Sequence, residues 1–282
     1  NAARLGVGNQ SLGLTEVAFQ NALAYAKDRI QMRSLSGTKA KDKDADPIIV
    51  HPDVRRMLLT CKAFTEGARA LTLWAGMHLD IANAHPDPAK RQASDDLVAL
   101  LTPVLKAYQT DMGFECANLA IQVHGGHGYI AEYGVEQYAR DARITMIYEG
   151  ANGVQAMDLV GRKLAANGGR AVMSFFNEVD AFIAAEEANT DLKPFLDALA
   201  DAKADLNDGT MWLMQNGLMN PDNAGAASTD YMHLFGLVVL GYMWAKMAKS
   251  ANEALAAGNG DADYYKNKLL TGRFYMEKIM PE

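Results

Sequence analysis

Apolar residues recur at helical spacing along almost the whole chain, and this pattern limits the fold more than any other feature. Within residues 13–32, for example, Leu14, Val17 and Ala18 fall on one face of a helix. Nowhere do β-branched residues alternate with polar ones over the length of a strand. We therefore predict an all-α protein that has no sheet.

Turn-forming residues divide this pattern into a first bundle of long helices and a second helical group. Pro52 suits the first turn of a helix, and the sequence His85-Pro-Asp-Pro88 ends that helix. Asn167-Gly-Gly169 marks the expected boundary between a helical bundle, residues 1–164, and an additional helical domain, residues 165–282. Helices are expected at residues 13–32, 52–84, 95–123, 136–143, 150–164, 170–187, 192–218, 229–257 and 262–278.

The composition excludes several classes of function. A chain of 282 residues that is 49% hydrophobic can bury a substantial core, and its net charge of −7 argues against nucleic acid as a partner. Cys61 and Cys116 lie in apolar helical patterns, so we interpret them as buried thiols of a cytoplasmic protein and expect no metal site. The apolar stretch of residues 231–248 contains His233 and Lys246, which indicates a core helix and not a membrane span.

Two segments carry residues suited to chemistry. Residues 122–129 are rich in glycine, which lets a ligand come close to the backbone. Glu149 follows the apolar run of residues 144–147, and desolvation in such surroundings makes a carboxylate a stronger base. Each feature also has a structural explanation, because a glycine pair often caps a helix and a glutamate is favoured before a helix start. Their joint spacing favours the functional interpretation.

Three motifs stand at fixed distances within residues 1–164. They are Tyr25-Ala-Lys-Asp-Arg29, Gln122-Val-His-Gly-Gly126 and Arg140-Asp-Ala-Arg-Ile-Thr-Met-Ile-Tyr-Glu-Gly150. Together they resemble the C-terminal helical domain of acyl-CoA dehydrogenases, FAD enzymes that oxidise acyl-CoA thioesters to 2-enoyl-CoAs. The helical extension after Gly169 resembles a larger subgroup of this family, which includes 3-methylmercaptopropionyl-CoA dehydrogenases.

The resemblance implies that the chain is the C-terminal part of a longer enzyme, an expectation that also fits a start at Asn1 without a methionine. The N-terminal helical domain and the middle β domain of the family would then lie upstream. Because those domains carry the flavin ring in this family, we expect the 282 residues alone to be inactive.

The resemblance also implies residue roles. Glu149 matches the catalytic base, which removes the α proton of the thioester while the β hydride passes to the flavin. The backbone N–H of Glu149 would polarise the thioester carbonyl, and Arg29 would meet the FAD pyrophosphate across the interface of a homodimer. The implied FAD contacts are Arg29, Gln31, Gln122, Val123, His124, Gly125 and Gly126, and the implied acyl-CoA contacts are Asn1, Arg4 and Gly150.

Some positions depart from the family pattern or have no role in it. Ala151, Gly153 and Pro52 replace residues that contact FAD in the family, although Gln155 could compensate. His127 is expected to face solvent or to cap a helix. Asp141 and Arg143 are expected to form a structural ion pair, and residues 34–47, with their mixed charges, a flexible surface loop.

Three functions remain open at this point. The first is an acyl-CoA dehydrogenase of fatty acid metabolism that oxidises a thioester, such as 3-methylmercaptopropionyl-CoA, and passes electrons to an electron-transfer flavoprotein. The second is an acyl-CoA oxidase, which uses the same base but delivers electrons to oxygen. The third is a catalytically silent helical dimerisation module, which would have no need for Glu149 and Arg29 at these positions.

Overall fold

The computed structural model describes residues 2–217 and 219–281, and this part of the chain contains helices and no strand. The predicted all-α class is therefore confirmed. The α-helices are α1 (Ala2–Asp28), α2 (Pro52–Ala84), α3 (Pro88–His124), α4 (Gly126–Tyr129), α5 (Glu136–Thr145), α6 (Asn152–Asp158), α7 (Arg170–Glu186), α8 (Lys193–Asn216), α9 (Pro221–Ala256) and α10 (Ala262–Phe274). Shorter 3-10 and π-helical segments are η1 (Ile48–Val50), η2 (Ala131–Tyr133), η3 (Leu159–Lys163), η4 (Ala166–Gly169) and η5 (Tyr275–Ile279).

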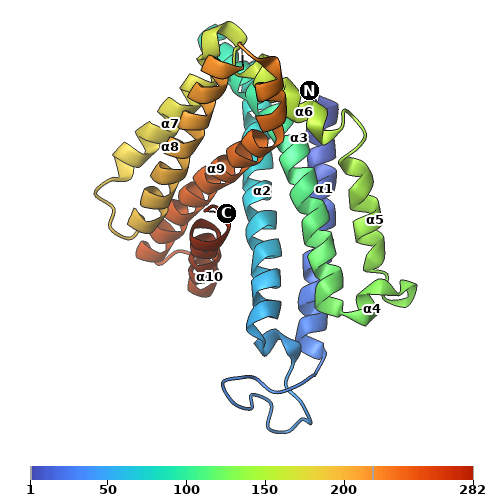
Figure 1. Ribbon diagram of the computed structural model, residues 1–282. Coiled ribbons are helices and arrows are strands. Elements are labelled where there is room, and N and C mark those ends of the chain that lie inside the picture. Colours follow the sequence, from blue (N-terminus) through green and yellow to red (C-terminus); the bar gives the residue numbers. More distant parts are fainter. Residues whose placement is uncertain (1, 218, 282) are drawn as a thin grey trace.

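The long helices α1, α2 and α3 stand side by side, and α5 lies along the same bundle (Figure 1). Helix α1 begins at Ala2, so the prediction of a start at residue 13 is wrong. Gly8 belongs to a close crossing of α1 and α3, because a Cβ there would lie 2.7 Å from the carbonyl oxygen of Leu105. Gly8 thus serves helix packing, a role that is not visible in the sequence alone.

Helix α3 also begins earlier than expected, at Pro88 and not at residue 95. The carboxylate of Asp87 accepts a hydrogen bond of 2.8 Å from the backbone N–H of Ala89, which caps the helix. Proline at the first helical position removes an N–H group that would have no partner there. Pro103 lies buried inside the helix, which continues through it as predicted.

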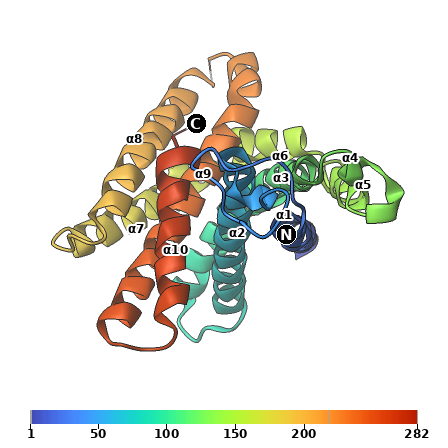
Figure 2. The same ribbon diagram turned by 90° about the horizontal axis from the view of Figure 1, so that it is seen from below.

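Helices α7 to α10 form the second group, on the opposite side of the α1–α3 bundle from α5 (Figures 1 and 2). Helix α9 joins the two groups, since Trp244 is fully buried and its indole N–H donates to the carbonyl of Ala63 on α2 at 3.1 Å. Gly67 makes room for this ring, because a Cβ there would lie 2.8 Å from Trp244 Nε1. The hydrophobic core is therefore continuous between the groups, and the division near residue 165 stays a prediction.

The loop after α1 is more ordered than predicted. The side chain of Asp46 is fully buried, and its carboxylate accepts hydrogen bonds from the backbone N–H groups of Ser34, Lys39 and Ala40 at 2.7–2.9 Å. These hydrogen bonds, led by Ser34, lower the pKa of Asp46 to about 2, and Arg33 adds an ion pair of 3.3 Å. The charged segment is thus built around one buried carboxylate, and the expectation of a simple flexible loop is wrong.

Three other predictions concern a membrane span, a disulfide and a metal site. No helix within the described ranges is both long and apolar enough to cross a membrane. Cys61 and Cys116 are buried and form no disulfide, as predicted. Among the residues that the structure describes, no group of histidine, cysteine and acidic side chains is arranged to hold a metal ion.

Candidate active site

Glu149 lies in the loop between α5 and α6, near the N-terminal end of α1 (Figure 1). Its φ of 56° is in the left-handed region, which glutamate seldom adopts, and Gly150 follows with a φ of 86°. Backbone strain of this kind costs about 1–3 kcal/mol and persists where the surroundings enforce it. Such strain is frequent at functional sites, and it was not predicted from the sequence.

The carboxylate of Glu149 faces an open hollow of about 710 Å³, which Arg4 and Gln155 also line. Glu149 itself is exposed, so the predicted dry environment is absent from the described residues. The apolar neighbours that were expected to cover it, Ile147 and Tyr148, point largely into solvent as well. The loop therefore supplies the position of the carboxylate but does not shield it from water.

Polar side chains from α1 and α6 support this loop. Gln155 Nε2 donates to the backbone carbonyls of Glu149 and Gly150 at 3.4 and 3.3 Å, and a Cβ on Gly150 would collide with it at 2.3 Å. Arg4 donates to Gln155 Oε1 at 2.9 Å and to Asp158 at 3.0 Å. Gln155 thus holds the backbone next to Glu149.

Near the N-terminal end of α1, the carboxylate of Asp158 lies between the guanidinium groups of Arg4 and Arg162. Burial opposes ionisation of Asp158, but hydrogen bonds from Arg162 and Arg4 outweigh it and lower the pKa of Asp158. The guanidinium of Arg4 is therefore fixed beside the hollow. Within residues 2–217 and 219–281, the backbone N–H of Glu149 has no hydrogen-bond partner, so it can donate to a ligand.

A second hollow, of about 220 Å³, lies near the other end of α1. All seven residues predicted to contact the cofactor line it, although they come from two separate segments of the chain. These residues are Arg29, Gln31, Gln122, Val123, His124, Gly125 and Gly126. Gly125 has φ 60° and ψ −139°, a conformation that favours glycine, and the space beside both glycines is open.

Aromatic rings build the wall of this hollow. Tyr25 stacks on His124 with ring centroids 4.3 Å apart, and its hydroxyl is hydrogen-bonded to His127 Nδ1 at 2.8 Å. His127 in turn stacks on Tyr133 at 4.5 Å. His127 is therefore part of a ring cluster, and the expectation of a solvent-facing or capping residue is wrong.

The protonation of His124 follows from its surroundings. Its Nδ1–H donates to the carbonyl of Ala120 at 2.8 Å, because a carbonyl can only accept. Burial lowers the pKa of His124, so the imidazole is neutral near pH 7. In this tautomer Nε2 is left as a hydrogen-bond acceptor at the hollow.

The two hollows share no lining residue. Arg4 and Tyr25 are 21 residues apart on α1, which places them about 32 Å apart along the helix axis at 1.5 Å per residue. Figure 1 shows the Glu149 loop and the α3–α4 turn at opposite ends of the bundle. The predicted catalytic residue and the predicted cofactor contacts are thus not brought together within one chain.

Two further predictions have different outcomes. Asp141 and Arg143 do not form the expected ion pair, because residues two positions apart on α5 point in different directions. Asp141 accepts from Gln137 at 2.7 Å instead, and Arg143 contacts the sulfur of Met146. Asn1, predicted to contact acyl-CoA, lies outside the described residues.

Sequence reasoning missed a buried lysine beneath the loop. Lys106 on α3 is fully buried, and its ammonium donates to Asn152 Oδ1 at 2.7 Å. Burial lowers the pKa of Lys106 to about 8, although Asp111 and Glu149 act in the opposite direction. The available signal was one lysine within an otherwise apolar helical run, since residues 100–105 contain only apolar residues, proline and one threonine.

Comparisons with known proteins show the family of the chain. The family model described as "Acyl-CoA dehydrogenase, C-terminal domain" matches residues 1–164, and one described as "Acetyl-CoA dehydrogenase C-terminal like" matches residues 175–282. The chain is 39% identical to the 3-methylmercaptopropionyl-CoA dehydrogenase of Ruegeria pomeroyi over 286 residues. That match covers 100% of this chain and 47% of the relative, so the chain spans about half the length of that protein.

Two solved structures share the fold. The first is Caenorhabditis elegans ACDH-11 in complex with C11-CoA, with a TM-score of 0.76 and 18% identity over 98% of this chain and 42% of that one. The second is an acyl-CoA dehydrogenase from Bacillus anthracis complexed with FAD, with a TM-score of 0.73 and 18% identity over 100% of this chain and 47% of that one. With a family model matched over more than half of its length, the chain belongs to the acyl-CoA dehydrogenase family.

Proposed function

We propose that the protein containing this chain is an FAD-dependent acyl-CoA dehydrogenase that converts an acyl-CoA thioester to a 2-enoyl-CoA. The observation that carries this proposal is Glu149, held on a strained loop at the mouth of a hollow in a chain of this family. In this function Glu149 removes the proton from the α carbon of the thioester. Its exposure leaves room for a substrate to reach it.

The surroundings of Glu149 suit such a substrate. An α C–H is a weak acid, so the thioester carbonyl must be polarised while the proton leaves. The unpartnered backbone N–H of Glu149 is one donor for that oxygen. Arg4 offers a fixed positive charge at the same hollow for the anionic coenzyme portion, and the left-handed Gly150 lets the acyl chain pass close to the backbone.

The residues at the other hollow fit a dinucleotide such as FAD. Arg29 supplies an exposed cation for a pyrophosphate, and the open space at Gly125 and Gly126 admits a ligand against the backbone. Gln31, Gln122 and the acceptor nitrogen of His124 offer polar contacts around it. When bound, the flavin accepts the hydride from the β carbon.

The separation of the two hollows favours a homodimer. A distance of about 32 Å along α1 prevents one chain from placing both groups around the same reacting atoms. A second copy can supply Arg29 and the glycine segment to the cofactor that serves the Glu149 of the first. We infer such an arrangement in the cytoplasm, with an electron-transfer flavoprotein as acceptor and the helices after residue 165 as a supporting domain.

The substrate class is tested in the full-length, flavin-loaded protein. Short, branched, long-chain and sulfur-containing acyl-CoA thioesters, among them 3-methylmercaptopropionyl-CoA, are mixed with it without oxygen. Flavin bleaching with at least one thioester is expected, and no bleaching with any of them would refute the proposal. Rapid formation of peroxide after oxygen is admitted would indicate an oxidase instead.

The dimer is tested by mixing two defective variants. Glu149→Gln removes the base and Arg29→Ala weakens cofactor retention, so each variant alone has low activity without added FAD. A heterodimer of the two contains one site in which Glu149 and Arg29 are both intact, provided that the residues come from different copies. Activity should therefore reappear after co-expression, whereas a site built within one chain would give none.

A further inference from the structure

The side chain of Asn152, three residues after Glu149, is fixed to α3 by every polar atom it has. Its Oδ1 accepts from Lys106 Nζ at 2.7 Å. Its Nδ2 donates to the carbonyl of Ala107 at 3.1 Å, to Thr110 Oγ1 at 2.8 Å and to Asp111 Oδ1 at 2.7 Å. A half-buried amide with this many partners holds one geometry.

The same residue closes the loop that carries Glu149. The backbone N–H of Asn152 donates to the carbonyl of Met146 at 3.0 Å, so residues 146–152 form a closed turn. Glu149 and Gly150, both with positive φ, lie within this turn. Because a strained conformation persists only where its surroundings enforce it, the anchor at Asn152 and the strain at Glu149 belong together.

Lys106 adds a positive charge below the turn. Burial lowers the pKa of Lys106, and the negative charges of Asp111 and Glu149 oppose this effect. The other charged groups here are Asp111, on the same helix, and His233 of α9, whose Nε2–H donates to Asp111 Oδ2 at 2.8 Å. The network thus reaches from the second helical group to the turn of Glu149.

We propose that Asn152 and Lys106 are positioning residues for Glu149. Asn152 holds the turn in its left-handed conformation, and Lys106 holds Asn152 through the hydrogen bond of 2.7 Å from its ammonium to Asn152 Oδ1. This inference rests on the proposed function, because it concerns the same base. Neither residue touches the acyl-CoA in this arrangement, since neither lines the hollow at Glu149.

The experiment uses the full-length protein with FAD and its best acyl-CoA substrate, and it follows anaerobic flavin reduction. Lys106→Met should slow reduction about 10- to 100-fold, the scale expected for a displaced catalytic group, while the Kd of the thioester changes little. Lys106→Arg keeps a donor for Asn152 Oδ1 and should therefore retain more of the wild-type rate than Lys106→Met. Asn152→Ala should slow reduction by a similar factor, again with little change in the Kd of the thioester.

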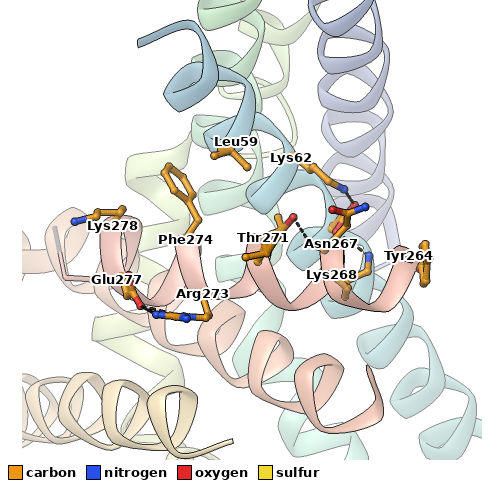
Figure 3. A pocket seen from close by; sticks show the side chains of 12 residues that line it. Leu59, Lys62, Tyr264, Asn267, Lys268, Thr271, Arg273, Phe274, Glu277 and Lys278 are labelled. Carbon is orange, nitrogen blue, oxygen red and sulfur yellow. Dashed lines mark hydrogen bonds and ion pairs between the residues drawn. The ribbon is translucent and has the colours of Figure 1, made fainter. Parts of the chain in front are cut away.

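A matched control separates these effects from a general loss of stability. Lys268 on α10 is also largely buried, with 14% of its side chain exposed, and it pairs with Glu66 at 2.7 Å. It lines a groove between α2 and α10, far along the sequence from the turn (Figure 3). Lys268→Met should lower the Tm but leave the reduction rate and the Kd of the thioester unchanged.

The outcomes distinguish this inference from the proposed function. If Glu149→Gln abolishes reduction while Lys106→Met and Asn152→Ala keep the wild-type rate, the positioning role is refuted and the base stands. If Glu149→Gln reduces flavin at the normal rate, the proposed function itself fails. A drop in rate for Lys106→Met that Lys268→Met reproduces would also overturn the positioning role.

Discussion

The two ends of α1 are surrounded by different kinds of residues. At the N-terminal end, Arg4, Asp158 and Lys106 place charges around a strained turn, and water reaches the Glu149 carboxylate. At the C-terminal end, stacked rings and glycines surround a small hollow. The residues at the first end position one side chain and surround it with charges, whereas those at the second end determine the shape of the hollow.

This difference suggests that substitutions at the two ends have different consequences. Changes at the Glu149 end should alter the rate of flavin reduction and leave cofactor content intact. Changes at the glycine end should alter cofactor content and leave the reduction rate of loaded protein intact. The following predictions test this separation in the full-length protein.

The largest effect is expected for Glu149→Gln. Removal of a general base typically costs about 10²- to 10⁴-fold in rate, and glutamine keeps the size of the side chain. Stopped-flow flavin bleaching should therefore slow by this amount, with flavin content and thioester binding unchanged. Glu187→Gln, at an exposed glutamate after α7, serves as the control and should behave as wild type.

The next effect is expected for Arg29→Ala. The lost hydrogen bonds to a pyrophosphate should weaken FAD retention about tenfold or more. Flavin absorbance after dialysis measures this, and the variant refilled with FAD should reduce at the wild-type rate. Lys41→Ala, an exposed lysine in the following loop, is the matched control. Equal flavin content in Arg29→Ala and Lys41→Ala would contradict the expectation that changes at this end of α1 alter cofactor content.

Gly125 and Gly126 allow a sharper comparison at the same end. Gly125→Ala places a side chain at φ 60°, which should cost about 1–3 kcal/mol of folding stability. Gly126→Ala has open space and no such backbone restriction, so its Tm should stay unchanged. If FAD lies against this segment, Gly126→Ala should still lose flavin. Retention of flavin in both variants would contradict the assignment.

The smallest effect concerns the loop that follows Arg29. The pKa of Asp46 in the folded protein, about 2, lies below its ordinary value of 3.8, so the ionised carboxylate stabilises the loop above about pH 4. This contribution should disappear as the pH falls towards 2. Hydrogen-exchange protection of the Ser34, Lys39 and Ala40 amides should follow that course. Asp46→Asn should show reduced protection already at neutral pH, and equal protection in both proteins would refute the role.

Helices were predicted correctly where residues typical of helix ends mark their boundaries. Helix α2 was placed correctly from residue 52 to residue 84, because prolines stand at its start and beyond its end. The start of α1 was missed, since Gly8 serves contact with α3 and looks like a helix breaker in isolation. Close helix crossings depend on a partner that sequence periodicity cannot identify.

The same limit applies to the candidate site. The residues around the second hollow were predicted as a group, because their motifs keep the spacing of the family. The roles of Lys106 and Asn152 were missed, since they depend on α3 passing beneath a turn that follows 45 residues later in the chain. Desolvation of Glu149 was inferred from neighbours in sequence, but those side chains point outwards.

The positive φ of Glu149 lowers the stability of the fold at the same position that the proposed activity requires. A glycine there would adopt the same backbone conformation without steric conflict, so the fold would gain stability from losing the side chain that we propose as the catalytic base. Selection for robustness alone would tend to erase this residue. A Glu149→Gly protein that melts at a higher temperature and no longer bleaches its flavin would make this conflict measurable.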